Sequence, residues 1–187
     1  MIDRITPTLR PEGDCSWYHK WRTLLFMHWE VPVEELRSKV PEELEIDTFE
    51  GKAYIGLVPF TMTGIRPRWL PYLPGGDSFH ETNVRTYVHF RGRDPGVWFF
   101  SLDAANPAAV TAARIGWHLK YHFASIKMKV TGDHVDYSTS RISPGPKPAE
   151  LEMAWDIGKP IGHAQPGTFE HFLAERYFLY AKKNATL

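Results

Sequence analysis

Cysteine is nearly absent from this chain, and so is any excess of charge of one sign. The 187 residues include a single cysteine, Cys15, which excludes an internal disulfide and argues against a disulfide-stapled secreted scaffold. Lys and Arg together number 22, and Asp and Glu also number 22, so the formal net charge is zero. Because proteins that bind nucleic acid through its phosphates carry a positive surplus, we expect no nucleic-acid partner.

Long apolar runs are also missing. No stretch of about 18 apolar residues is present, so we expect no membrane-spanning helix and no membrane partner. The N-terminal segment MIDRITPTLRPEGD has no apolar signal core, and we therefore expect a cytoplasmic protein. The hydrophobic fraction of 43% and the aromatic fraction of 14% are typical of a packed globular chain. The length predicts a single domain over residues 1–187, in which residues 1–20 form an extended N-terminal arm.

Familiar catalytic and metal-binding motifs are missing too. There is no phosphate-binding glycine loop, no nucleophile elbow and no paired-cysteine metal site. Among the nine histidines, His118 and His122 are four positions apart, but they span an expected change from helix to strand. No histidine spacing therefore supports a zinc site, which stays open only as an alternative. We expect no metal and no cofactor.

Strand patterns dominate what is present. Strands are expected over residues 23–31, within 44–67 on both sides of a turn at 50–51, and over 80–90, 97–104, 121–130, 135–143, 150–156 and 177–180. Short helices are expected after Pro32, after Asn106-Pro107 and after the N-cap Thr168, and tight turns at 92–96 and 131–133. Regular alternation of strands and helices is absent. The pattern predicts a mainly β (α+β) fold, an antiparallel β-barrel or cone with an internal cavity.

One expected strand, HETNVRTYVHF (80–90), carries an unusual load of polar groups on one face. Side chains alternate between the two faces of a strand, so the odd positions share one face. We call these odd positions the polar file: Glu81, Asn83, Arg85, Tyr87 and His89. The expected neighbouring strands are apolar, so the polar file is either a solvated ladder or the lining of a cavity, and the pattern leaves both open.

Two ionisable residues of the polar file invite a specific expectation. Buried charges must be paired, and Glu81 and Arg85 share a face, so they form the expected ion pair. Such a pair would depress the pKa of Glu81. Lys120, which ends the segment Gly116-Trp117-His118-Leu119-Lys120, is a second candidate. A desolvated lysine can attack a carbonyl to form a Schiff base, although a lysine at a helix end is also favoured simply by the helix dipole.

Several phrases of the sequence resemble a known family. WEVPVEEL, LEIDTFEGKAYIGLVPFTMTGIRPR, FHETNVRTYV, GVWFFSLDA and PGTFEHFLAERYFLYA resemble the YqjF-like family of uncharacterised bacterial proteins, in order, over about residues 17–181. The resemblance implies an acetoacetate decarboxylase-like fold, which is a mainly antiparallel β-barrel or cone around a cavity. It also implies that the polar file faces inward.

This chain matches the catalytic lysine segment of the distant decarboxylase relatives only in part. Distant decarboxylase relatives form a Schiff base on a lysine in a Gly-aromatic-Pro-Lys-Lys segment, assisted by a glutamate on a preceding strand. Glu81 looks like that glutamate, and residues 116–120 look like the lysine segment. However, Leu119 stands at the first lysine position and His118 at the proline. The resemblance therefore does not support the decarboxylase mechanism.

Three functions remain as hypotheses. The leading one is a protein that binds a small carboxylate- or carbonyl-bearing molecule in its cavity, through the residues Asn83, Arg85, Tyr87 and His122, with the loop 66–78 covering the entrance through Trp69 and Tyr72. The second is an enzyme acting on a small keto acid, with Glu81 and Lys120 as its catalytic residues. The third is a structural or interaction protein whose cavity is filled by side chains. Because decarboxylase relatives assemble, the resemblance also allows a homo-oligomer.

Overall fold

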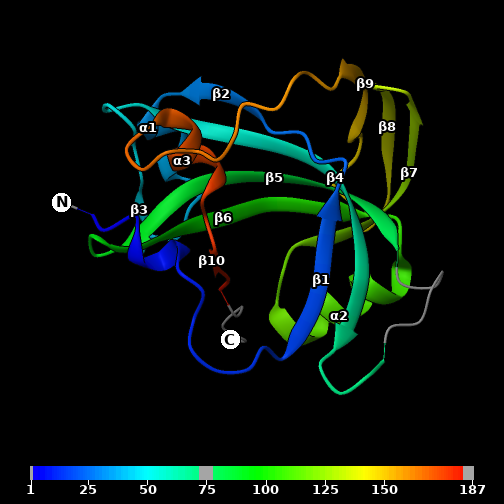
Figure 1. Cartoon of the computed structure of the whole chain (residues 1–187), viewed down its shortest axis with the longest axis horizontal. Coiled ribbons are helices and arrows are strands. Elements are labelled where there is room, and N and C mark those ends of the chain that lie inside the picture. The colour runs from blue at the N-terminus through cyan, green and yellow to red at the C-terminus, as the bar shows by residue number, and fades with distance from the viewer. Residues whose placement is uncertain (1, 72–77, 183–187) are drawn as a thin grey trace.

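A computed structural model describes residues 2–71 and 78–182 of the chain. Its elements, coloured along the chain in Figure 1, are predominantly strands. In chain order they are η1 (Thr6–Thr8), β1 (Trp17–Arg22), β2 (Met27–Val31), α1 (Val33–Arg37), β3 (Glu45–Ile46), β4 (Ala53–Pro67), β5 (Phe79–Phe90), β6 (Arg93–Ala104), α2 (Pro107–Trp117), β7 (Tyr121–Thr131), β8 (His134–Ser143), β9 (Glu150–Asp156), α3 (Phe169–Ala174) and β10 (Phe178–Tyr180). No helix within these residues is long and apolar enough to cross a membrane.

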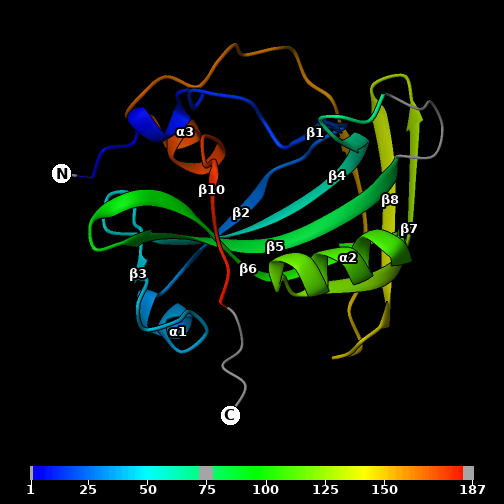
Figure 2. The ribbon, with the colours of Figure 1, turned by 90° about the horizontal axis from the view of Figure 1, so that it is seen from below.

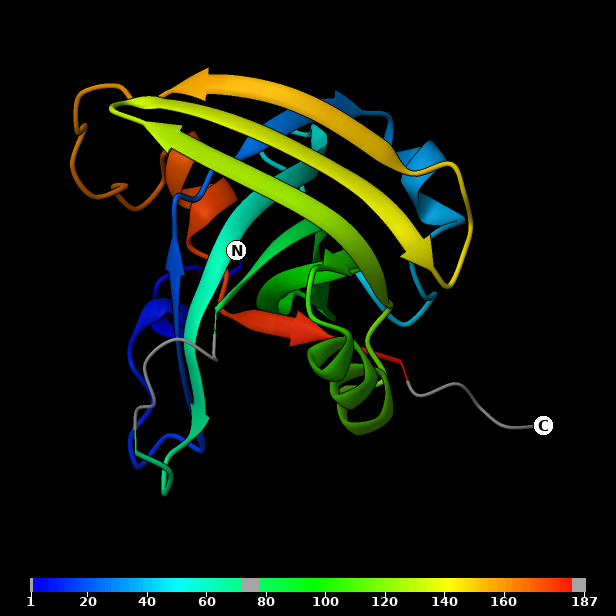
Figure 3. The same cartoon turned by 90° about the vertical axis from the view of Figure 1, so that its right-hand side faces the viewer.

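The strands form one strongly curved sheet. Its path runs β1-β4-β5-β6-β7-β8-β9, with β2 beside β4, β3 beside β5 and β10 beside β6. The strands pair antiparallel, with two exceptions: β7 and β10 each pair in parallel with β6. Figure 3 shows β7, β8 and β9 arching over the central strands. The predicted mainly β fold is confirmed, and its shape is an open cone, because the described path ends at β1 and β9 and does not close into a barrel.

The central strand β5 is covered on both faces. Its odd face, which carries the polar file, packs against α2 and α3 in a core cluster that includes Tyr87, Val110 and Phe172. Its even face packs against the segment around α1, where Val88 contacts a second core cluster, and against β8. In Figure 2, α1 and α3 lie on opposite sides of β5 and β6. The solvated-ladder interpretation of the polar file is therefore wrong.

Local signals placed several elements correctly. Asn106 caps α2 by accepting hydrogen bonds from two backbone N–H groups, and the Thr168 side chain accepts one from the backbone of His171 at the start of α3. The expected hairpin of β7 and β8 turns at Gly132-Asp133, and β9 covers 150–156 as predicted.

Other boundaries differ from the expectation. The expected arm contains β1, which pairs with the distant end of β4 and is followed by Thr23 with a positive φ of 48°. The strand expected over 23–31 begins only at Met27. The helix after Pro32 ends at Arg37. The turn expected over 92–96 is instead the two-residue turn Arg91-Gly92, where both residues have positive φ, as a tight hairpin requires.

Candidate functional site

The polar file lies in the protein interior. Glu81 and Asn83 are each 1% exposed, Arg85 is 2% exposed and Tyr87 is fully buried. His89, at the far end of β5, lies 3.7 Å from the Glu45 carboxylate near the surface. Four polar residues are thus held side by side on one face of a rigid central strand, beneath α2 and α3.

Glu81 is a buried carboxyl held by a phenol rather than by a cation. Its Oε2 accepts a hydrogen bond of 2.9 Å from the hydroxyl of Tyr121. Burial raises the pKa of Glu81 to about 8; the Tyr121 hydrogen bond opposes this rise, and the charge of Asp103 adds to it. The carboxyl is therefore mostly protonated at neutral pH. The predicted Glu81–Arg85 ion pair and the depressed pKa of Glu81 are both wrong.

Arg85 is a buried cation whose described partners include no carboxylate. Its Nη2 donates to the carbonyl of Leu173 at 3.1 Å and to the Tyr87 hydroxyl at 3.4 Å. The guanidinium also stacks over Phe26, 5.0 Å from the ring centre. Its Nε–H has no acceptor and the neighbouring Asn83 Oδ1 has no donor among the described protein atoms. Two adjacent members of the polar file thus keep unused hydrogen-bonding capacity in the interior.

His28, on β2, contacts the polar file at the Tyr87 hydroxyl. The Tyr87 hydroxyl donates to the Leu173 carbonyl at 3.0 Å, so the His28 Nε2 at 2.6 Å must donate to that hydroxyl. Burial and the charge of Arg85 lower the pKa of His28 to about 4, so it is neutral at pH 7. A Cβ at Gly56 would lie 3.1 Å from the His28 Nε2, so glycine leaves the room that His28 needs.

Sequence reasoning missed the groups that touch the polar file from other elements. Phe26 and His28 come from the segment at the start of β2, and Tyr121 comes from the start of β7; both segments are distant in sequence from β5, and no local motif marks them. The strand register explains the position of His28, which lies opposite Gly56, while Gly56 lies opposite Arg85.

Lys120 and His122 are not part of this interior group. The Lys120 ammonium lies 5.0 Å from the centre of the Trp98 ring, and Trp98 pairs with Thr86 on the even face of β5. Leu119, in contrast, packs against the core cluster that surrounds the odd face. His122 donates from Nδ1 to the carbonyl of Pro144 at 2.8 Å and is opposite Asp103, also on the even side.

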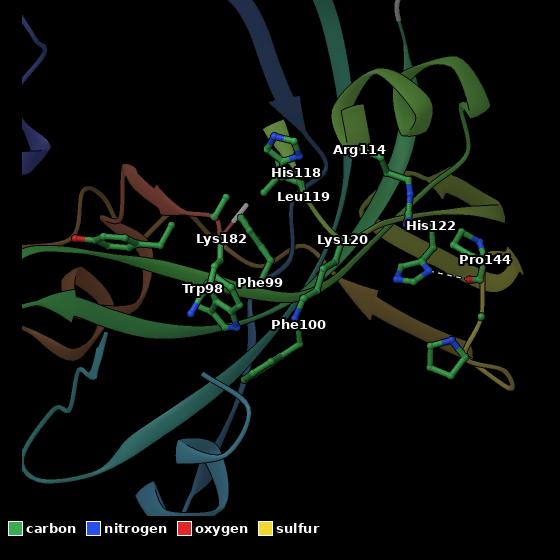
Figure 4. A pocket seen from close by; sticks show the side chains of 14 residues that line it. Trp98, Phe99, Phe100, Arg114, His118, Leu119, Lys120, His122, Pro144 and Lys182 are labelled. Atoms are coloured by element: carbon green, nitrogen blue, oxygen red, sulfur yellow. Dashed lines mark hydrogen bonds between the residues drawn. The ribbon is translucent and has the colours of Figure 1, made fainter. Parts of the chain in front are cut away.

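The structure therefore separates the predicted site residues into two groups on opposite faces of the sheet. Glu81, Asn83, Arg85 and Tyr87 form the interior group, whereas Lys120 and His122 line an open pocket at the edge of β6 (Figure 4). Of the expected cover, Trp69 is 81% exposed, and Tyr72 lies outside the described residues. Across residues 2–71 and 78–182, no cluster of three or more His, Cys, Asp or Glu side chains is arranged to hold a metal ion.

Comparison with known proteins places the chain in a family. Residues 18–187 match the model of DUF2071, described as an uncharacterized conserved protein. The chain belongs to the DUF2071 family. This DUF2071 protein is 42% identical over 171 residues to the uncharacterized protein YqjF of Bacillus subtilis (strain 168), a match that covers 91% of this chain and 69% of that protein. The resemblance drawn from its sequence phrases is confirmed.

Solved structures show the fold of this DUF2071 protein. Acetoacetate decarboxylase from Legionella pneumophila superposes with a TM-score of 0.53 at 16% identity, over 67% of this chain. The enduracididine biosynthesis enzyme MppR, complexed with pyruvate, superposes with a TM-score of 0.54 at 15% identity, over 79% of this chain. The DUF2071 chain spans 45% and 59% of the lengths of these two solved chains. At this identity the likeness establishes the acetoacetate decarboxylase-like fold alone.

Proposed function

We propose that this DUF2071 protein binds a small organic acid in its interior, through Arg85 and Asn83. The observation that carries the proposal is the environment of Arg85, a guanidinium that is 2% exposed and whose described partners are a carbonyl, a phenol and aromatic rings. A buried charge is costly unless it is paired. A carboxylate on a ligand supplies the missing counter-charge, and guanidinium groups bind carboxylates strongly.

Asn83 narrows the chemistry of the ligand. Asn83 and Arg85 are two positions apart on one strand face, so their side chains emerge roughly 7 Å apart, within the span of one small molecule. The Nε–H of Arg85 needs an acceptor and the Oδ1 of Asn83 needs a donor. A small acid with a carboxylate or carbonyl oxygen and a neighbouring hydroxyl satisfies both atoms.

The state of Glu81 supports the same ligand class. With its pKa raised to about 8 by burial, this carboxyl is neutral at pH 7 and does not repel an incoming carboxylate. Among the fold neighbours, MppR has been solved with pyruvate, which is a small keto acid. Lactate, the hydroxy counterpart of pyruvate, has both the carboxylate and the hydroxyl donor and is the first probe; pyruvate and acetoacetate, which lack that donor, are compared with it.

Titration calorimetry with these three acids tests the proposal. We expect at least one to bind the wild-type protein, and we expect Arg85→Gln to weaken that binding roughly 10- to 100-fold, because a hydrogen bond to a charged group contributes about 1.5–3 kcal/mol. Arg22→Gln, which removes an exposed arginine on β1, is the matched control and should bind as the wild type does. Thermal unfolding of each variant establishes that it is folded. If no acid binds, or if Arg85→Gln binds as well as Arg22→Gln does, the proposal is wrong.

A further inference from the structure

A pocket opens at the edge of β6, beside Lys120. Two strands pair in parallel with this edge: β10 along residues 96–98 and β7 along residues 102–104. Residues 99–101 lie between the two pairings, and the pocket occupies this gap. Its volume is about 660 Å³, within the range of small-molecule sites. Its walls come from the end of α2, the start of β7, the loop 144–146 and the segment after β10.

The polar lining of this pocket is entirely basic. The lining residues with ionisable side chains, apart from the phenol Tyr180, are Arg114, His118, Lys120, His122 and Lys182, and no Asp or Glu is among them. In Figure 4, Lys120 lies between Trp98 and His122, with His118 and Arg114 nearer to α2. Basic groups from residues 114–122 and from Lys182, which are distant in sequence, thus line the same pocket.

The nearby carboxylates leave most of this charge unbalanced. Lys182 forms an ion pair with Glu43 at 2.8 Å. Both carboxylate oxygens of Asp103 accept hydrogen bonds from the guanidinium of Arg141. Arg114 donates from Nη1 to the carbonyl of Tyr121, and no carboxylate pairs with it or with Lys120 among the described residues. Two permanent positive charges therefore remain, which match a ligand group of charge −2. A phosphate monoester carries about −1.5 to −2 at pH 7.

The rest of the lining is apolar and aromatic. Trp98, Phe100 and Tyr180 contribute rings, and Pro144, Gly145 and Pro146 also line the pocket. Free phosphate would use only the basic side of such a pocket. A planar organic body attached to the phosphate would cover the rings as well, and burial of that apolar surface adds affinity.

We infer that the pocket between β10 and β7 binds a small phosphate monoester with an aromatic or similarly apolar body. Lys120 and Arg114 contact the phosphate, and Trp98, Phe100 and Tyr180 contact the body. This site lies at the edge of the sheet, and its lining includes neither Arg85 nor Asn83, so it is separate from the organic-acid site proposed above.

Calorimetry with phenyl phosphate, inorganic phosphate and benzoate tests the inference. We expect phenyl phosphate to bind most tightly, because only this probe has both the double charge and the ring. We expect Lys120→Gln to weaken phenyl phosphate binding by about tenfold, since it removes one of the two unbalanced charges. Lys159→Gln, which removes an exposed lysine outside the pocket, is the matched control and should leave the affinity unchanged.

The outcomes separate this site from the organic-acid site. Arg85→Gln should keep the wild-type affinity for phenyl phosphate, and Lys120→Gln should keep the wild-type affinity for any acid that binds at Arg85. The inference is overturned if phenyl phosphate does not bind, if it binds no better than inorganic phosphate or benzoate, or if Lys120→Gln and Lys159→Gln bind it equally. Because Lys120 is exposed, its substitution should not unfold the protein, so loss of binding reports on the pocket itself.

Discussion

At the scale of single residues, Glu81 gives the protein a pH-dependent component of stability. Its pKa is raised from 4.5 to about 8 in the folded state, mainly by burial. The folded state therefore holds this proton more tightly than the unfolded state does, so the stabilisation is fully present below pH 4.5 and is lost as the pH rises toward about 8. The Glu81→Gln variant cannot ionise at this position, so we expect its free energy of unfolding not to show this loss between pH 4.5 and about 8. Over that pH range the wild type should lose at most roughly 3–5 kcal/mol more than the variant does.

Urea denaturation below and above that window measures the effect of Glu81. Glu152→Gln, an exposed glutamate on β9, is the matched control and should keep the pH dependence of the wild type. Equal pH dependence of the unfolding free energy in Glu81→Gln and the wild type would mean that the Glu81 carboxyl ionises normally in the folded protein.

Lys120 carries a second prediction at this scale. Its ammonium is exposed and lies over Trp98, on the face opposite Glu81, whereas Leu119 occupies the inward position. We expect no pyruvate adduct on Lys120 after treatment with pyruvate and borohydride, because this lysine is exposed to solvent and the sheet separates it from Glu81, the carboxyl that would have to assist it. Peptide mass spectrometry, with Lys120→Gln as the background control, reads this out. A stoichiometric adduct on Lys120 would restore the Schiff-base mechanism.

The polar file shows which residue properties the sequence could predict. Alternation alone placed Glu81, Asn83, Arg85 and Tyr87 on one face, because the two-residue period of a strand is a local property. It could not predict that Glu81 pairs with Tyr121, since that contact depends on how β7 docks in parallel beside β6. The expected ion pair with Arg85 is wrong for the same reason, because tertiary packing determines which groups contact Glu81 and Arg85.

At the scale of elements, Gly96 allows β10 to dock against β6. A Cβ at this position would lie 2.5 Å from the backbone carbonyl of Phe178, which is closer than real contacts allow. We expect Gly96→Ala to displace β10 and to speed amide hydrogen exchange at residues 178–180. Because β10 is short and its partner strand is central, we expect a stability loss of roughly 1–3 kcal/mol, in the range of overpacking substitutions.

Gly116→Ala is the matched control for Gly96→Ala. Gly116 lies in α2, and a Cβ there would meet no atom within 4 Å. Alanine in a helix is favoured over glycine by about 0.5–1 kcal/mol, so this variant should be as stable as the wild type or more so. Similar exchange at residues 178–180 in both variants would show that Gly96 is not needed for the docking of β10.

Elements with local signals were predicted, and elements defined by distant partners were not. Asn106-Pro107 and Thr168 marked the starts of α2 and α3, because a helix cap involves only neighbouring residues. β1 was missed within the expected arm, because its strand character depends on pairing with the far end of β4. The position of the turn at Arg91-Gly92 likewise follows from the register between β5 and β6.

At the scale of the whole molecule, the cone carries two separate groups of functional candidates. The sequence resemblance predicted the family and the fold, and with them an inward-facing polar file. The binding hypothesis grouped His122 with that file, and the enzyme hypothesis added Lys120 as a possible nucleophile, but the sheet separates both residues from Arg85. Which face a residue of β7 takes depends on the docking of this strand against β6, so the division into an interior site and an edge pocket is a property of the assembled sheet.

One buried ionic cluster connects distant parts of this sheet. Asp47, next to β3, accepts a hydrogen bond of 2.7 Å from Arg176, which follows α3, and it also contacts Arg4 near the N-terminus. The side chains of Asp47 and Arg176 are each 1% exposed, whereas that of Arg4 is 28% exposed. The cluster thus ties the N-terminal segment and the chain after α3 to the centre of the fold.

Removing the carboxylate from this cluster should destabilise the whole molecule. Asp47→Asn leaves the buried Arg176 charge without a carboxylate, and we expect a loss of roughly 3–5 kcal/mol in the free energy of unfolding. Arg4→Gln removes only the partly exposed partner and should cost about 1 kcal/mol or less. Urea denaturation of both variants at pH 7 measures the two losses. If Asp47→Asn costs no more than Arg4→Gln, then Arg176 finds another partner when the carboxylate is removed, and the ends of the chain are held by apolar packing instead.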